Sequence, residues 1–262
     1  MSEKNIRGCF VWHELMTTDP KAAKAFYTAI VGWKTKEWEG PNPYTLWMWG
    51  DTQMGGLMEL PRAAQETGAR PSWLAYVGTP DVDATTARAR ELGATVLMEP
   101  TDIPTIGRFS VLQDPQGASF AAFSPIPTQS PRPAAEPGLG DFSWHELATT
   151  DYAAAFDFYS DLFGWEKTSA MDMGPAGVYQ MYGQNGQPYG GIYNKMPEVP
   201  GPPAWLHYIR VENVHPLTEK IKEHGGQVIN GPMEVPGGDW ITMGIDPQGA
   251  PFAVHHKGAA QS

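Results

Sequence analysis

Apolar and polar residues alternate over residues 10–16, and this period of two is typical of a strand with one buried face. Asp19 followed by Pro20 then predicts the start of a helix, because an aspartate caps free backbone N–H groups and proline suits the first helical turn. Apolar spacing carries the helix to Gly32. Short aromatic-rich segments separated by Gly, Pro and Asn predict three strands, near 33–38, 44–49 and 54–60.

The same order of elements then begins again. Residues 72–78 are typical of a strand, and Asp81 begins a helix that ends at Gly93. Three further strands are predicted near 94–98, 109–112 and 119–123. Each half of the chain is therefore strand, helix and three strands, repeated once, which predicts an α+β fold of four βαβββ modules.

An internal repeat at an offset of 132 residues covers nearly the whole chain. Trp-His-Glu-Leu at 12–15 recurs at 144–147, and Asp-Pro-Gln-Gly-Ala at 114–118 recurs at 246–250. The Gly-Gly pair at 55–56 recurs at 190–191, and we expect these glycines to mark a bulge or a close backbone contact rather than a phosphate loop. We predict a first domain over 1–124, a proline-rich linker over 125–139 and a second domain over 140–262.

Charge and composition exclude several partners. The chain has 18 Lys and Arg against 29 Asp and Glu, and the net charge of -11 repels nucleic acid and anionic membranes. Apolar runs are too short for a membrane span and the first residues do not look like a signal peptide, so we expect a cytoplasmic protein. The single cysteine, Cys9, excludes an internal disulfide and a Cys-rich zinc site, and we expect it to behave as a small buried hydrophobe.

Three motifs together resemble the vicinal oxygen chelate superfamily, which includes glyoxalase I, extradiol dioxygenases and the bleomycin and fosfomycin resistance proteins. They are Phe-Tyr near the end of the first helix, Leu-Gly or His-Gly at the end of the second, and Asp-Pro-Gln-Gly before the last strand. The resemblance implies that two modules curl one sheet into a half-open barrel around a ligand. It also implies that the two halves of this tandem form pack together as an intrachain pseudo-dimer.

The resemblance also implies where a metal would bind, at a His seven residues before each helix-capping Asp and a Glu four residues after the last glycine turn. In this chain those positions hold residues that cannot ligate a metal: Trp12, Leu74, Ala121, Trp144, Leu206 and Ala253. We therefore expect no cofactor. If a bulge shifts the strand register by one residue, His13 and His145 point inward, and His145 with His207 and either Glu146 or His255 becomes a metal set.

Strand alternation without that shift predicts two pockets that each hold an indole and a carboxylate. Glu14 and Glu146 are then candidate general acids or bases. Alternatively, each pairs with a local donor such as Arg108 or lies at a solvated mouth. The second copy is more polar, so we predict Glu146, Tyr208 and His255 as its catalytic group, unless His255 and His256 form only a surface pair near a frayed end. The predicted ligand-binding aromatics are Trp12, Trp33, Tyr76, Trp144, Trp165 and Tyr208.

The preferred function is binding of a small, partly apolar or aromatic metabolite, which the protein sequesters or transforms without the usual metal site. The alternative is a metal-dependent enzyme, a lyase like glyoxalase I or an extradiol dioxygenase, with its site in the second domain. A third class, an interaction module, predicts filled cavities and an apolar outer patch. Fold alone does not decide among them, because one fold hosts several chemistries.

Overall fold

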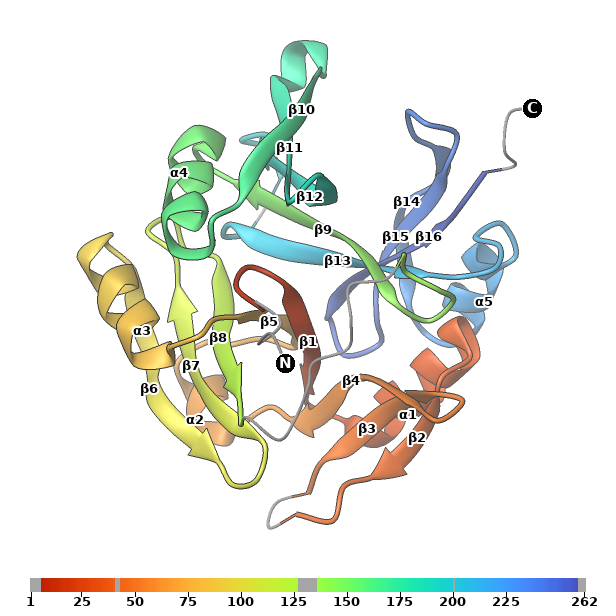
Figure 1. Ribbon diagram of the computed structural model, residues 1–262. Helices are drawn as coiled ribbons and strands as arrows, with labels where there is room; N and C mark the ends of the chain where they lie inside the picture. The colour runs from red at the N-terminus through yellow and green to blue at the C-terminus, as the bar shows by residue number, and fades with distance from the viewer. Residues whose placement is uncertain (1–5, 41–42, 127–135, 200, 259–262) are drawn as a thin grey trace. The chain divides into compact units, whose positions relative to one another are not determined.

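The computed structural model describes residues 6–40, 43–126, 136–199 and 201–258. Its strands form two eight-stranded sheets, one from each half of the chain (Figure 1). The first has the order β2-β3-β4-β1-β5-β8-β7-β6, with β1 (Phe10–Thr17), β2 (Lys34–Glu37), β3 (Thr45–Trp49), β4 (Thr52–Glu59), β5 (Ser72–Gly78), β6 (Thr95–Ile103), β7 (Gly107–Gln113) and β8 (Ser119–Pro125). The second has the matching order β10-β11-β12-β9-β13-β16-β15-β14, with β9 (Phe142–Thr149), β10 (Glu166–Asp172), β11 (Val178–Gln184), β12 (Gln187–Asn194), β13 (Ala204–Arg210), β14 (Gln227–Glu234), β15 (Trp240–Ile245) and β16 (Pro251–His256).

One helix follows the first strand of each module. These helices are α1 (Pro20–Val31), α3 (Val82–Glu91), α4 (Tyr152–Phe163) and α5 (Leu217–Glu223). The predicted cap of α1 is confirmed, because the Asp19 carboxylate accepts from the Ala22 N–H at 3.0 Å, and Gly32 ends the helix at a φ of 88° that favours glycine. The α+β fold of four βαβββ modules is thereby confirmed. No helix in the described part of the chain is long and apolar enough to cross a membrane.

Two short elements were not predicted. Helix α2 (Arg62–Glu66) lies between β4 and β5, and the 3₁₀ helix η1 (Gly174–Ala176) lies between β10 and β11. Neither has a buried residue, so no apolar periodicity marks it in the sequence. Most of the predicted linker, residues 127–135, lies outside the described residues, and the domain boundaries stay a prediction.

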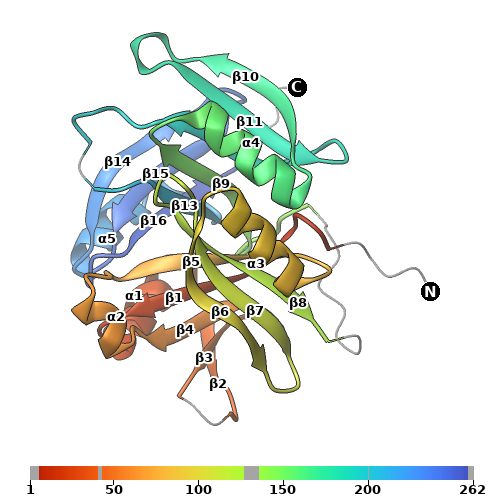
Figure 2. The same cartoon turned by 90° about the vertical axis from the view of Figure 1, so that its left-hand side faces the viewer.

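The first of two compact units consists of Met1–Trp12, Leu74–Ala135 and His145–Trp205. Its helices α3 and α4 lie side by side (Figure 2), and the Arg88 guanidinium donates two hydrogen bonds, each of 2.8 Å, to the Asp161 carboxylate. Aromatic side chains from α4 and the neighbouring strands fill its core, among them Phe120, Tyr159 and Trp165.

The second unit consists of His13–Trp73, Glu136–Trp144 and Leu206–Ser262. Helices α1 and α5 pack against each other in it. Its core repeats the first in composition, with Tyr27, Trp33 and Phe252 almost fully buried. Each unit thus draws most of one module from each half of the repeat.

Candidate functional site

The carboxylate of Glu146 lies among tyrosines in the first unit. Glu146 is on β9, directly opposite Gly191 of the parallel strand β12. The Tyr179 hydroxyl, from β11, donates to Glu146 Oε2 at 3.0 Å. Tyr193, two residues beyond Gly191, also donates a side-chain hydrogen bond to Glu146. One predicted acid–base residue is therefore held by two phenol groups.

Gly191 makes this arrangement possible. A Cβ atom at that position would lie 2.1 Å from the ring of Tyr179, which is far inside van der Waals contact. Tyr179 and Tyr193 are cross-strand partners, and their rings stack with centroids 5.7 Å apart. The glycine thus lets one tyrosine ring lie flat over the strand, and the pair forms an aromatic wall beside the carboxylate.

Tyr193 stays protonated over the physiological range. Burial raises its pKa first, the negative charge of Glu146 raises it further, and the hydrogen bond to Glu146 adds to the effect. A phenol whose pKa lies well above 10 keeps its O–H as a donor. The carboxylate of Glu146 therefore faces donors rather than a competing negative charge.

The second unit contains the counterpart from the first half of the repeat. Glu14 is 7% exposed and lies opposite Gly56, where a Cβ atom would meet the Tyr44 hydroxyl at 1.8 Å. The glutamate, glycine and tyrosine are thus repeated. The second tyrosine is not, because Met58 stands where the second half has Tyr193.

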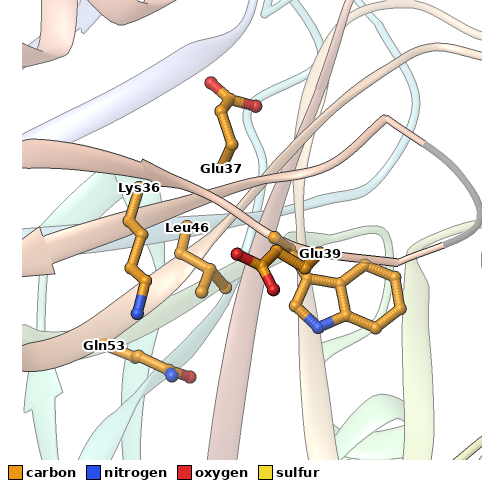
Figure 3. A pocket seen from close by; sticks show the side chains of 6 residues that line it. Lys36, Glu37, Glu39, Leu46 and Gln53 are labelled. Atoms are coloured by element: carbon orange, nitrogen blue, oxygen red, sulfur yellow. The ribbon is translucent and has the colours of Figure 1, made fainter.

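A shallow cavity of about 250 Å³ lies in the same sheet (Figure 3), lined by Lys36, Glu37, Trp38, Glu39, Leu46 and Gln53. Lys36 pairs with Leu46, Leu46 pairs with Gly56, and Gly56 pairs with Glu14 on neighbouring strands. Directly paired residues point to the same face of a sheet, so Lys36 and Glu14 lie on one face. Glu37 points the other way in Figure 3 and binds Lys24 at 2.5 Å. The first half therefore presents an ammonium group and a carboxylate on one face.

His255 lies in the second unit, where its ring bridges two polar side chains. Its Nδ1 is 3.0 Å from Ser143 Oγ, and its Nε2 is 2.9 Å from Asp239 Oδ2. The neighbouring ring of His256 accepts from the Val214 N–H at 3.2 Å. Both histidines lie on β16, and the rings of both are hydrogen-bonded. Tyr208 is buried, and its backbone carbonyl accepts from Ser143.

Three buried histidines lie on β1, β9 and β13. His13 stacks on Phe142 with centroids 3.7 Å apart and meets His207 edge to face at 4.9 Å. His145 stacks on Phe10 at 3.7 Å. His145 belongs to the first unit, and His13 and His207 belong to the second. The shifted register predicts His145 and His207 as metal ligands, and this stays a prediction.

Burial lowers the pKa of His207 to about 3, so its imidazole is neutral at physiological pH. A neutral imidazole is the form that ligates a metal, and it is also the form that packs against aromatic rings. The six positions that the resemblance implies as ligands remain without ligating atoms. The donor set of the family thus does not fit a metal here, whereas the neighbouring His13 and His207 offer nitrogen donors of the right type.

The remaining predicted residues are dispersed. Trp33 and Trp165 lie in the two cores, where their indole N–H groups donate to the carbonyls of Gly140 and Gly8 at 3.0 and 2.8 Å. Tyr76 is buried near Phe109 and Phe123. Trp12 and Trp144 are half-buried, and Arg108 binds two other carboxylates, those of Asp83 and Asp102. Their roles in ligand binding stay predictions.

Sequence reasoning missed Tyr179, Tyr193, Ser143 and Asp239. Tyr179 carried a usable signal, because it recurs as Tyr44 at the offset of 135 that the glycine pairs show. Ser143 and Asp239 carried none, since their counterparts are Val11 and Gly107.

Comparison with known proteins decides the family. The model of the Glyoxalase/Bleomycin resistance protein/Dioxygenase superfamily matches residues 10–121 and 141–254. The chain belongs to this superfamily. The predicted membership in the glyoxalase-like, vicinal oxygen chelate superfamily and its tandem form are confirmed. The superfamily fold thus occurs once in each half of the chain.

Relatives in this superfamily match the chain over different lengths. CFP32 from Mycobacterium tuberculosis, provisionally named a glyoxylase, is 43% identical over 48% of this chain, but the match spans only about half, 47%, of that relative. The anthracycline biosynthesis protein DnrV of Streptomyces peucetius is 28% identical over 94% of this chain and 92% of its own length. The match to DnrV thus extends over nearly the full length of both chains.

Solved structures of a glyoxalase and of a dioxygenase share the fold. The Mn(II)-bound glyoxalase from Novosphingobium aromaticivorans aligns with a TM-score of 0.66 at 18% identity, over 97% of this chain and 83% of that one. The 2,3-dioxygenase LapB from Pseudomonas sp. KL28 aligns with a TM-score of 0.65 at 12% identity, over 97% and 94%. At these identities the likeness concerns the fold alone.

Proposed function

We propose that this superfamily member binds a small, partly aromatic molecule beside Glu146, and that the Glu146 carboxylate moves a proton on that molecule. The observation that supports the proposal is the hydrogen bond from Tyr179 to Glu146, next to the stacked rings of Tyr179 and Tyr193. A carboxylate beside an aromatic wall can orient a polar edge of a ligand while the rings contact its flat face.

The chemistry follows from the groups present. Glu146 is the one carboxylate that both tyrosines contact, so it is the acceptor for a ligand proton. When a ligand O–H replaces one phenol as the donor, the other phenol keeps the carboxylate in place. This step needs no metal ligand from the six family positions.

An anthracycline is a suitable probe, because the full-length relative DnrV is named for anthracycline biosynthesis and the probe is a planar aromatic with phenolic edges. The experiment is a fluorescence titration of the anthracycline with wild-type protein, Glu146→Gln and the repeat-matched control Glu14→Gln. We expect Glu146→Gln to weaken binding about tenfold, equivalent to about 1.4 kcal/mol, and Glu14→Gln to leave it unchanged. Equal Kd values for all three proteins would contradict the proposal.

A second candidate function is that of a metal-dependent lyase or dioxygenase, which the neighbouring buried imidazoles of His13 and His207 in the second unit favour. These histidines would hold a divalent cation, which when bound would polarise a ligand oxygen as a Lewis acid. The protein would supply the nitrogen ligands and the apolar packing of Phe142, which orients the His13 ring.

Elemental mass spectrometry on untagged protein separates the two candidates. About one equivalent of iron, manganese, nickel or zinc that is lost in His207→Ala would favour the metal enzyme. Metal content far below one equivalent in protein incubated with these ions would leave the histidines as packing residues. The exposed His224 provides the matched control variant, His224→Ala.

A further inference from the structure

We propose that Ser143, His255 and Asp239 form a nucleophilic site that cleaves small carboxylic esters, separate in its residues from the Glu146 site. All three lie in the second unit. Ser143 Oγ is 3.0 Å from His255 Nδ1, and His255 Nε2 is 2.9 Å from Asp239 Oδ2. A serine hydroxyl, an imidazole and a carboxylate in hydrogen-bonded series are recognised as nucleophile, base and orienting group by their geometry, whatever their order in the sequence.

Four consecutive strands of the second sheet, β9-β13-β16-β15, place these groups (Figure 1). Ser143 is on β9, and His255 is near the end of β16, opposite Ile241 of β15. Asp239 immediately precedes β15, and its second oxygen, Oδ1, accepts from the Gly258 N–H at 3.1 Å. The carboxylate is therefore fixed at both oxygens.

Asp239 determines which nitrogen of His255 carries the proton. A carboxylate accepts hydrogen bonds, so the neutral imidazole places its N–H on Nε2 and leaves the lone pair of Nδ1 toward Ser143. The Ser143 hydroxyl has a second acceptor in range, the Tyr208 carbonyl at 3.2 Å, but Nδ1 is the closer. The hydroxyl can thus pass its proton to the imidazole without rearrangement.

The site is reachable from solvent but is not fully solvated. The His255 side chain is 13% exposed and that of Asp239 36%. Arg210 is the direct parallel partner of His255 on β13, so the two side chains leave the sheet on the same face. The Arg210 guanidinium donates to the Pro137 carbonyl and places a positive charge on this face.

The repeat shows that packing alone does not require this array. Ser143, Asp239 and His255 correspond to Val11, Gly107 and Phe123 in the first half, and Arg210 corresponds to Gly78. The first half builds the same fold without any of the four polar side chains. The fold therefore does not require these four polar residues, which are present only in the second half.

The reaction balances without a further reagent except water. Ser143 Oγ forms a bond to the ester carbonyl carbon while its proton moves to His255 Nδ1. The bond from that carbon to the alkoxy oxygen breaks, and the leaving alcohol takes the proton. A water oxygen then forms a bond to the acyl carbon while one of its protons moves to His255 Nδ1. The bond from that carbon to Ser143 Oγ breaks, Oγ takes the proton from His255, and the carboxylic acid is released.

The test uses the full chain and an alkyl fluorophosphonate, which phosphonylates activated serines. Labelled protein is digested, and the modified peptide is identified by mass spectrometry. Labelling rates are compared for wild type, Ser143→Ala, His255→Gln, Asp239→Asn and the control Ser169→Ala. Ser169 is an exposed serine whose hydroxyl contacts Met181 Sδ rather than a base. Circular dichroism confirms that each variant is folded.

We expect one label per chain at Ser143, lost in Ser143→Ala and unchanged in Ser169→Ala. His255→Gln should slow labelling about 100-fold, and Asp239→Asn about tenfold or more. Hydrolysis of p-nitrophenyl acetate should follow the same order. Absence of label at Ser143 in folded wild-type protein, or labelling of His255→Gln at the wild-type rate, would overturn the proposal.

Discussion

The Tyr27 hydroxyl donates to Asp246 Oδ2 at 3.1 Å, although 219 residues separate the two in the sequence. Trp73 Nε1 donates in turn to the Tyr27 hydroxyl at 2.9 Å. The first unit repeats this chain, with Trp205 bonded to Tyr159 and Tyr159 to Asp114. The Phe-Tyr, Trp-Leu and Asp-Pro-Gln-Gly motifs of the repeat therefore meet in the cores and stabilise the fold.

Replacing Tyr27 with Phe should destabilise the protein by about 1–3 kcal/mol, because Asp246 and Trp73 would each lose a buried partner. Burial already raises the pKa of Asp246, and loss of the hydrogen bond from Tyr27 would destabilise the charged carboxylate further. Urea unfolding measures the change. Tyr152→Phe, at a half-buried tyrosine on α4, is the control and should change stability by less than about 0.5 kcal/mol. A Tyr27→Phe protein as stable as wild type would contradict the structural role.

Gly191→Ala should disrupt the Glu146 site. The new Cβ would lie 2.1 Å from the Tyr179 ring, which must then leave its place over the strand. We expect a loss of about 1–3 kcal/mol in unfolding free energy and weaker binding of an anthracycline. Gly138→Ala is the control, because its Cβ would approach only Asp141 Oδ2, at 3.4 Å. Unfolding curves for the two variants that coincide would count against the close packing.

His207 should make stability fall at mildly acidic pH. Its folded pKa, about 3, lies below the ordinary value of 6.5, so below pH 6.5 the unfolded chain takes up a proton that the folded chain refuses. The contribution is therefore complete above pH 6.5 and is lost as the pH falls. Between pH 7 and 5.5 the loss is about 1.3 kcal/mol.

The measurement is urea unfolding at both pH values for wild type and for His207→Ala. This substitution introduces the residue found at the matching position of the first half, Ala75. Between the two pH values, wild type should lose about 1.3 kcal/mol more unfolding free energy than the variant loses. The exposed His224→Ala should keep the wild-type difference. If His207→Ala shows the same difference in stability as wild type, protonation of His207 does not cause the loss.

The sequence was sufficient to predict the repeat, the four modules and the caps at Asp19 and Asp81, because capping and alternation are local signals. It also singled out Glu14, Glu146 and the glycine pairs. The partners of Glu146 depend on strand register between β11, β12 and β9, which local alternation does not determine.

The burial of Trp33 and Trp165 in the cores could not be predicted from local sequence patterns either. Trp33 and Trp165 follow the glycines that end α1 and α4, a position that fits a pocket or a core equally well in sequence. Their burial is decided by the aromatic residues that meet them from distant segments, such as Phe142 for Trp33 and Trp205 for Trp165. Neither contact has a signature within a window of neighbouring residues.

The two halves differ at one residue beside the shared glutamate, glycine and tyrosine, since Tyr193 in the second corresponds to Met58 in the first. The most direct test of the Glu146 site is therefore the Kd of an anthracycline for the exchanged pair Tyr193→Met and Met58→Tyr. The account predicts about tenfold weaker binding for Tyr193→Met and no loss for Met58→Tyr. Unchanged affinity in Tyr193→Met, or an equal loss in both variants, would contradict it.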